Sequence, residues 1–147
     1  MMLVAAAGPG SNLLLAAMGA VALGLLVRWF GDWREPSLLL AFTSANLVNF
    51  LLINIFLALF NLLPIPPFDG SHIVEGLLPR DVARRYSSFR RFGLPLVIVL
   101  LLVLPALVPG FDIIGRVVLP PAEWLRGHYL ALAELVAGRS FSGPGAA

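Results

Sequence analysis

Asn61-Leu-Leu-Pro64-Ile-Pro66-Pro67-Phe68-Asp69-Gly70-Ser71-His72 interrupts an apolar run that has carried no charge since Pro36. The three prolines cannot continue a helix, because each lacks a backbone N–H and clashes with the preceding turn. Residues that precede a proline are pushed toward extended backbone, which is tolerated at membrane depth only inside protein or along a cavity. The stretch therefore predicts a membrane helix that breaks at the prolines, continues as extended chain and is followed at once by a carboxylate, Asp69.

The composition on either side of this break is that of an integral membrane protein. Of the 147 residues, 59% are hydrophobic and 12% are charged, whereas an average soluble domain is roughly 45–50% apolar and about 25% charged. Met1–Val27, Pro36–Phe68 and Phe92–Phe111 carry no charge, and each can supply the about 20 residues that a membrane helix needs. We predict an all-α polytopic membrane protein with spans at about residues 12–29, 38–63 and 92–108.

The remainder of the chain is less apolar than these runs. Residues 1–111 form the predicted membrane domain, and residues 112–137 form an interfacial helical region in which Pro121 opens a helix with apolar residues at helical spacing. Charged residues such as Arg126 and Glu134 argue against a full crossing, so this helix is expected to lie in the membrane interface. Residues 138–147 are expected to form a disordered tail.

Arginine determines the predicted orientation. All ten basic residues are Arg, and five of them lie in the loop Asp69–Arg91, so the positive-inside rule places this loop in the cytoplasm. The membrane is expected to be a bacterial or archaeal cell membrane. The formal net charge of +2 gives no nucleic-acid footprint. The absence of cysteine excludes a thiol nucleophile and a Cys-ligated metal.

Polar residues around the break are the candidates for a site. Asn54 and Asn61 fall on nearly the same helix face, and because an amide facing lipid is costly, they are expected to point into a helix bundle or a wet cavity. Hydrogen bonding between helices accounts for each of them equally well. If a helix begins at Gly70, Asp69 and His72 can share one face, as in a Glu-x-x-His metal pair. The alternative is that Asp69 caps a cytoplasmic helix, and the spacing leaves both readings open.

Two motifs resemble those of the site-2 protease family of intramembrane zinc metalloproteases. Asn61-x-x-Pro64-x-Pro66-x-x-Asp69-Gly70 is similar to the family signature N-x-x-P-x-P-x-x-D-G, and Ala7-Gly8-Pro9-Gly10-Ser11-Asn12 is similar to the A-G-P-x-x-N that opens an earlier helix. The resemblance extends from about Ala5 to Pro105. It implies that Asp69 is a ligand of a catalytic zinc, and that Asn54, Asn61, Pro64, Pro66 and Gly70 line the substrate groove or support the site. His72 is a further, weaker candidate ligand.

The chain departs from the family in one large respect. It contains no H-E-x-x-H, the motif that in the family supplies the other two zinc ligands and the general base, so no catalytic residue is assigned here. Phe68 also stands where the family usually has Leu. We expect the chain to be the rear part of a longer protease, completed by a segment that carries H-E-x-x-H, and to be inactive alone; a shortened paralogue without catalysis is the alternative.

The expected activity of the complete protein is zinc-dependent hydrolysis of a peptide bond in or near a transmembrane segment of a substrate protein. Two other functions compete with it. Broken helices with intramembrane polar groups also occur in transporters, and the same groove in a non-catalytic membrane scaffold would bind transmembrane partners. An in-frame H-E-x-x-H upstream would favour the protease.

Overall fold

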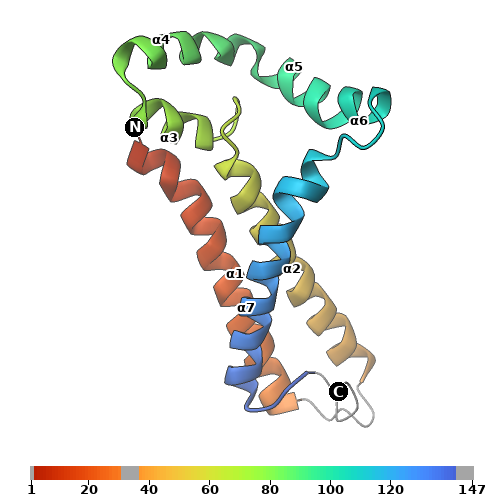
Figure 1. The fold of residues 1–147 in the computed structure, drawn as a ribbon. Coiled ribbons are helices and arrows are strands. Elements are labelled where there is room, and N and C mark those ends of the chain that lie inside the picture. Colours follow the sequence, from red (N-terminus) through yellow and green to blue (C-terminus); the bar gives the residue numbers. More distant parts are fainter. Residues whose placement is uncertain (1, 31–36, 142–147) are drawn as a thin grey trace.

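A computed structural model describes residues 2–30 and 37–141 of the chain, and Figure 1 shows their arrangement. Three long helices run the length of the molecule: α1 (Met2–Phe30), α2 (Leu38–Leu62) and α7 (Leu119–Ala137). Shorter elements cross one end of them: α3 (Gly70–Leu77), α4 (Arg80–Ser88), the 3-10 turn η1 (Phe89–Phe92), α5 (Gly93–Ile98), the π-helical turn η2 (Val99–Val103) and α6 (Leu104–Leu107). The described residues include no strand, which confirms the all-α prediction.

The observed boundaries of α2 agree with the prediction, whereas the observed start of α1 does not. The Ser37 side chain caps α2 by accepting a hydrogen bond from the Leu40 amide (3.2 Å), and the helix ends two residues before Pro64, within one residue of the prediction. The prediction that the first helix starts at Asn12 is wrong. The helix starts at Met2 and contains Pro9 in its interior, because a proline removes only one backbone hydrogen bond and membrane helices tolerate this where neighbouring helices pack around it.

Small residues bring α1 and α2 into close contact. Ala16 and Ala20 on α1 are fully buried, and they pack with Leu51 and Ile55 of α2 in the same apolar core. Gly19 lies against the Phe50 ring, where a Cβ would come within 3.0 Å of a ring carbon. Helices associate in membranes through such small residues, since close packing replaces the hydrophobic drive that water provides.

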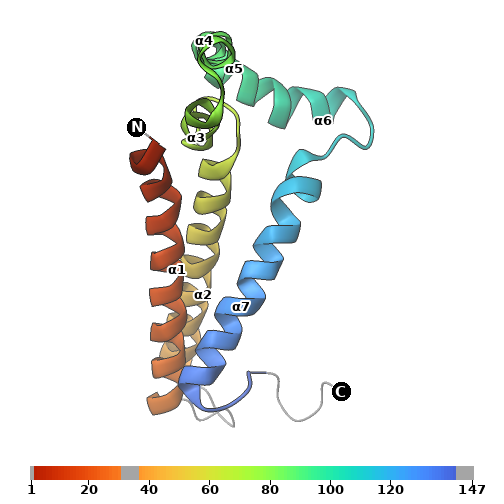
Figure 2. The same cartoon turned by 60° about the vertical axis from the view of Figure 1, so that its left-hand side comes forward.

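Helix α7 joins this pair through its alanines. Ala122, Ala133 and Ala137 are buried, and a Cβ on Gly24 of α1 would lie 2.5 Å from the Ala133 carbonyl oxygen. Tyr129 Oη donates a hydrogen bond to the Leu13 carbonyl (3.0 Å). The predicted C-terminal helix is therefore present, but it lies along α1. It converges with α1 and α2 at the end of the bundle away from α3, called the far end below (Figure 2).

Two of the described helices, α1 and α2, are long and apolar enough to cross a membrane. A third span arises only if α4 and the helical run Gly93–Leu107, which are bent by 76° relative to each other, count together. The run expected to be the third span is thus helical to Leu107, but it leads across the end of the bundle (Figures 1 and 2). Its crossing of the membrane stays a prediction.

The end of the bundle away from α3 is tied together by polar contacts. An Arg28 guanidinium nitrogen donates to the Val136 carbonyl (3.3 Å), and Arg139 donates in return to the Val27 carbonyl. Gly138 ends α7 in the left-handed conformation (φ 71°). The Glu134 carboxylate accepts the Phe141 amide (2.7 Å). Residues 138–141 are therefore anchored, in contrast to the expectation of a tail beginning at Gly138, and residues 142–147 lie outside the described residues.

Candidate metal-ligand site

The proline loop, residues 63–69, joins α2 to α3. Leu63 is extended (φ −59°, ψ 132°), as predicted, and its amide bonds back to the Phe60 carbonyl (3.0 Å). Beyond it the prediction of an extended run is wrong, because the chain forms turns: the Phe68 amide bonds to the Ile65 carbonyl and the Ser71 amide to the Phe68 carbonyl, both at 3.0 Å. The turns give these amides acceptors near the end of a membrane helix, where backbone donors need partners.

Gly70 allows α3 to begin directly against the end of α2. A Cβ at this position would lie 2.3 Å from the Leu62 carbonyl oxygen and 2.5 Å from that of Leu63. Both contacts are to backbone atoms, so a side chain could not be accommodated by a rotamer change. The Asp-Gly pair therefore has a steric reason: the glycine fixes the close approach that places the aspartate.

Asp69 occupies the position before α3, yet its side chain makes no capping hydrogen bond. Its backbone is already helical (φ −60°, ψ −30°), whereas a capping residue is typically in the β region. The carboxylate is directed toward α1, since a Cβ at Gly8 would lie 2.7 Å from Asp69 Oδ2. The structure thus brings together the Gly-Pro motif of α1 and the Asp-Gly pair.

The Asp69 carboxylate has no partner among the described residues. It is half-buried, and within residues 2–30 and 37–141 its oxygens accept no hydrogen bond and form no ion pair. A half-buried carboxylate without a donor loses solvation and gains nothing in return. The absence of a side-chain hydrogen bond to the first turn of α3 does not fit the capping interpretation.

The other sequence candidates have local roles in the structure. Asn54 is buried and donates to the Phe50 carbonyl of its own helix (2.8 Å), while Asn61 is half-buried. His72 is half-buried and has an interaction partner of its own. The Pro64 carbonyl accepts a hydrogen bond from Tyr86 Oη (2.7 Å), and Pro66 is buried.

These residues do not form a complete zinc site. In the part of the chain that the structure describes, no three His, Cys, Asp or Glu side chains gather closely enough to hold a metal ion. A catalytic zinc requires three protein ligands and an open position, and Asp69 offers one of them. The donor type fits zinc, whereas the number of donors does not.

Three residues that shape the site were not predicted as site residues. Gly8 adjoins the carboxylate, and its signal was present in the Gly-Pro motif of α1. Gly93 lies against the Pro66 carbonyl group, where a Cβ would come within 3.0 Å of the carbonyl carbon. Tyr86 bonds to Pro64. Neither Tyr86 nor Gly93 had a signal in the sequence, because both contacts depend on how the chain folds back over the proline loop.

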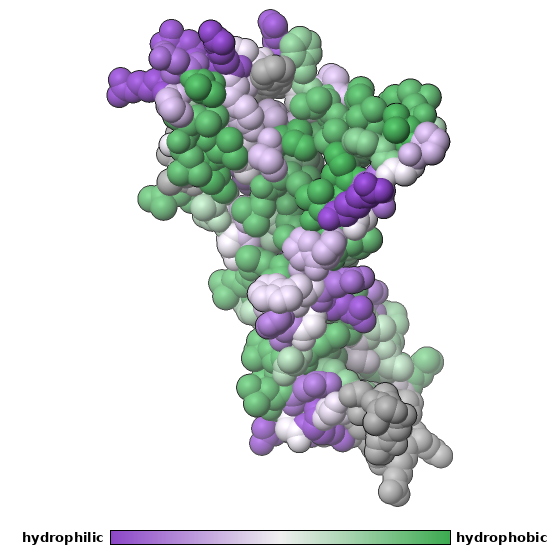
Figure 3. Space-filling model, viewed as in Figure 1, coloured by the Kyte–Doolittle hydropathy of each residue, from purple (hydrophilic) through white to green (hydrophobic). Residues whose placement is uncertain are grey.

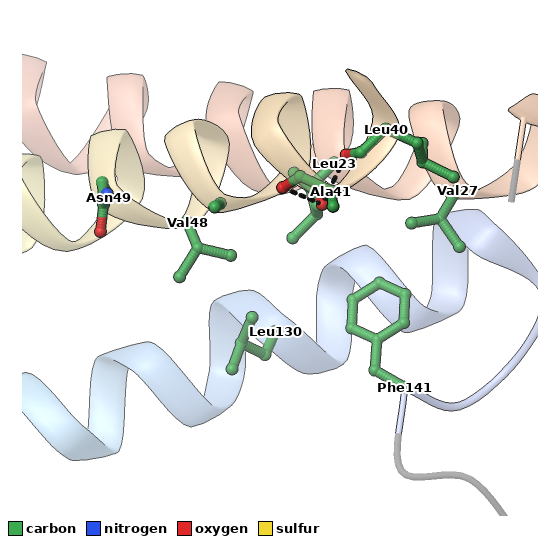
Figure 4. A pocket seen from close by; sticks show the side chains of 10 residues that line it. Leu23, Val27, Leu40, Ala41, Val48, Asn49, Leu130 and Phe141 are labelled. Carbon is green, nitrogen blue, oxygen red and sulfur yellow. Dashed lines mark hydrogen bonds between the residues drawn. The ribbon is translucent and has the colours of Figure 1, made fainter. Parts of the chain in front are cut away.

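An apolar cavity lies away from the proline loop. A space of about 480 Å³ opens between α1, α2 and α7, lined by Leu23, Val27, Leu40, Ala41, Val48, Asn49, Leu130 and Phe141 among others. Figure 4 shows Leu130 and Phe141 facing it from the α7 side and the α2 residues from the opposite side. Its lining contains neither Asp69 nor Asn54 nor Asn61. The cavity is therefore separate from the candidate ligand.

Comparison with known proteins agrees with the motifs. Residues 39–104, from α2 to the start of α6, match peptidase family M50. The chain is 40% identical over 102 residues to a protein of Bacillus subtilis (strain 168) named "Putative zinc metalloprotease YwhC"; the aligned part is 67% of this chain and 44% of that protein. The chain thus spans less than half the length of this curated relative. No solved structure matches it significantly. The chain belongs to peptidase family M50, the site-2 protease family.

Proposed function

We propose that this chain is part of a membrane-embedded zinc metalloprotease that hydrolyses a peptide bond in or near a transmembrane segment of a substrate protein. The observation that carries the proposal is the Asp69 carboxylate, which is half-buried, uncapped and without a partner among the described residues. Family membership supplies the chemical context. The relative's name refers to a zinc metalloprotease, and we extend that activity to the protein of which this chain is part.

Asp69 is proposed as one zinc ligand. A carboxylate offers a hard oxygen donor and a negative charge that offsets the metal, and zinc accepts such a ligand beside histidine nitrogens. Gly8 and Gly70 serve this role indirectly. Gly70 lets the loop end against α2, and Gly8 leaves the space that the carboxylate occupies. Neither glycine touches a metal; both are positioning residues.

The remaining ligands and the general base are proposed to come from a segment that carries H-E-x-x-H. The described residues contain no group of three ligands that includes Asp69, and a catalytic zinc needs three protein ligands. When bound, a catalytic zinc acts as a Lewis acid toward the peptide carbonyl. The contribution of this chain is to present a fixed anionic ligand at the end of the bundle.

The substrate groove is proposed to follow the Asp69 end of α2. Asn61 is half-buried in the last turn of α2, two residues before the loop, and no described residue bonds to its side-chain amide. Asn54 is less suited to contact substrate, because its amide already donates to the Phe50 carbonyl. The loop that contains Asp69 is proposed to face the cytoplasm, in accordance with its five arginines.

Restoring the missing half of the site tests this proposal. The chain would be co-expressed with an H-E-x-x-H segment from the same family, and cleavage of a transmembrane reporter would be normalised to membrane-inserted protein. Asp69→Asn keeps the shape of the side chain but removes its charge, so it should reduce cleavage to the background level. Asp81→Ala, which removes an exposed carboxylate from α4, is the matched control and should cleave normally.

The two alternatives predict different outcomes of the same experiment. A scaffold or a transporter element would show no zinc-dependent cleavage in any variant, with binding of transmembrane partners unaffected by chelators. Cleavage by Asp69→Asn at the level of the control would contradict the ligand assignment. Asp69→Ala provides a second variant in case the amide of Asn binds the metal weakly.

A further inference from the structure

Helix α4 and the turn after it form an exposed cationic surface at the Asp69 end of the bundle. Arg80, Arg84, Arg85 and Arg91 are all exposed, and none of them forms an ion pair with a described residue. Figure 3 shows a strongly hydrophilic area at the upper left, over α4. The helix itself includes a single carboxylate, Asp81. These four residues are called the arginine surface below.

The arginine surface continues directly into an apolar one. The elements α5, η2 and α6 expose large aliphatic side chains, including Leu94 (65% exposed), Leu102 (67%) and Leu107 (72%). Figure 3 shows the hydrophilic area at the upper left and the apolar area at the upper right of the same end of the molecule. Cationic side chains beside an exposed apolar helix are typical of elements that lie at a membrane surface, with the apolar part in the acyl boundary and the charges among the headgroups.

Two contacts hold the arginine surface at the level where α2 ends. Tyr86 Oη on α4 donates to the Pro64 carbonyl (2.7 Å), and Gly93 at the start of α5 lies against the Pro66 carbonyl group. The proline loop directly follows the apolar helix α2, which is long enough to cross the bilayer. The arginine surface is therefore held close to the end of α2, which is the level of the headgroups if α2 crosses the bilayer.

We propose that the arginine surface is a docking site for the headgroups of anionic phospholipids. The charge is complementary, the adjoining α5–α6 surface is apolar, and anionic headgroups are the anions present at this level of the membrane. Because the same helix bonds to the proline loop through Tyr86, docking also holds the loop that ends in Asp69. The proposal does not depend on the proteolytic activity.

Fluorescence quenching in vesicles tests the docking site. The chain has no cysteine, so Ser88→Cys at the exposed end of α4 provides a single site for a fluorophore. The labelled protein is reconstituted in phosphatidylcholine, and spin-labelled phosphatidylglycerol or spin-labelled phosphatidylcholine is titrated in. We expect half-maximal quenching at a much lower mole fraction of phosphatidylglycerol. Each arginine removed should raise that mole fraction by about fivefold, the equivalent of about 1 kcal/mol per residue.

Two double variants separate the arginine surface from general charge. Arg84→Gln/Arg85→Gln should raise the half-quenching mole fraction strongly, whereas Arg116→Gln/Arg126→Gln removes the same charge from exposed positions near and on α7 and should leave it unchanged. High salt should remove the preference, because exposed charges are screened within about 10 Å at 0.1 M. Equal quenching by both lipids, or equal effects of both double variants, would overturn the proposal. Loss of the preference on adding inorganic phosphate, but not chloride of equal ionic strength, would also overturn it, since the surface would then bind free phosphate.

Discussion

The two ends of the helix bundle are built on opposite principles. At the far end, Arg28 of α1 donates a hydrogen bond to the Val136 carbonyl of α7, and Arg139, just after α7, donates one to the Val27 carbonyl of α1. The Glu134 carboxylate accepts a hydrogen bond from the Phe141 amide. At the near end, the Asp69 carboxylate accepts nothing from the described residues, although it is half-buried and faces Gly8. Buried and half-buried polar groups are normally paired. Polar contacts therefore close the far end, whereas at the near end a half-buried carboxylate stands without such a contact, and the proposed metal site rests on this difference.

Glycines allow close packing at both ends of the bundle. At the near end Gly70 and Gly93 bring the proline loop against backbone, and at the far end Gly24 brings α7 against α1. In both places a missing side chain allows close approach. Gly8 differs from Gly24, Gly70 and Gly93 in that its neighbouring group is a charged side chain, Asp69. Substitutions at these four glycines should therefore separate loss of stability from loss of function.

The largest effect on stability is expected for Gly70→Ala. Its Cβ would lie 2.3–2.5 Å from backbone atoms of Leu62 and Leu63, so α3 must move away from α2 at a cost of about 3 kcal/mol, the upper part of the usual range for overpacking. Unfolding of the purified protein in detergent, followed by circular dichroism, measures the change. A decrease in the free energy of unfolding of less than about 0.5 kcal/mol would contradict the close packing of α3 against the end of α2.

A smaller effect is expected for Gly24→Ala at the far end. The added Cβ would lie 2.5 Å from the Ala133 carbonyl oxygen and 2.7 Å from the Val136 Cβ, so α7 must shift away from α1. Because Gly24 meets one backbone atom where Gly70 meets three, we expect about 2 kcal/mol. Gly127→Ala on α7 has open space around its Cβ and is the matched control. Equal stabilities for these two variants would mean that α7 does not pack on α1 through Gly24.

The smallest effect is expected for Tyr86→Phe. The change removes the hydrogen bond to the Pro64 carbonyl and keeps the ring, so the free energy of unfolding should fall by about 1 kcal/mol, the ordinary net value of a hydrogen bond. Hydrogen exchange at Phe68 and Ser71, whose amides bond within the proline loop, should rise at the same time. Unchanged exchange at these amides would show that the contact with α4 does not stabilise the proline loop.

Part of this structure could be read from the sequence. The end of α2 before Pro64 and the position of Asp69 follow from proline sterics, which act locally. The start of α1 was missed, because a Gly-Pro-Gly run in isolation resembles a helix boundary, while in the structure Pro9 is buried inside the helix. The local sequence does not reveal the tertiary packing that allows such a proline inside a helix.

The packing of α7 illustrates the second limit. The spacing of its large apolar residues predicted one buried face, and its charged residues predicted a position in the membrane interface. The buried residues of this helix in the structure are Ala122, Ala133 and Ala137. Small residues carry little hydrophobic signal, although they decide how closely two membrane helices approach. The contact between Gly8 and Asp69 has the same character: both motifs were visible, but their meeting depends on the fold.

Zinc affinity of the completed assembly tests the central claim, that Asp69 is a metal ligand in the space left by Gly8. The chain is purified together with an H-E-x-x-H segment, and zinc is competed with a chelator for four proteins: wild type, Asp69→Asn, Gly8→Ala and Gly10→Ala. A Cβ at Gly8 reaches the Asp69 carboxylate, whereas Gly10 has open space. We predict that Asp69→Asn loses more than the roughly 10–100-fold that removal of an outer-shell contact costs, that Gly8→Ala loses part of the affinity, and that Gly10→Ala equals wild type. Wild-type zinc affinity in Asp69→Asn would contradict the account.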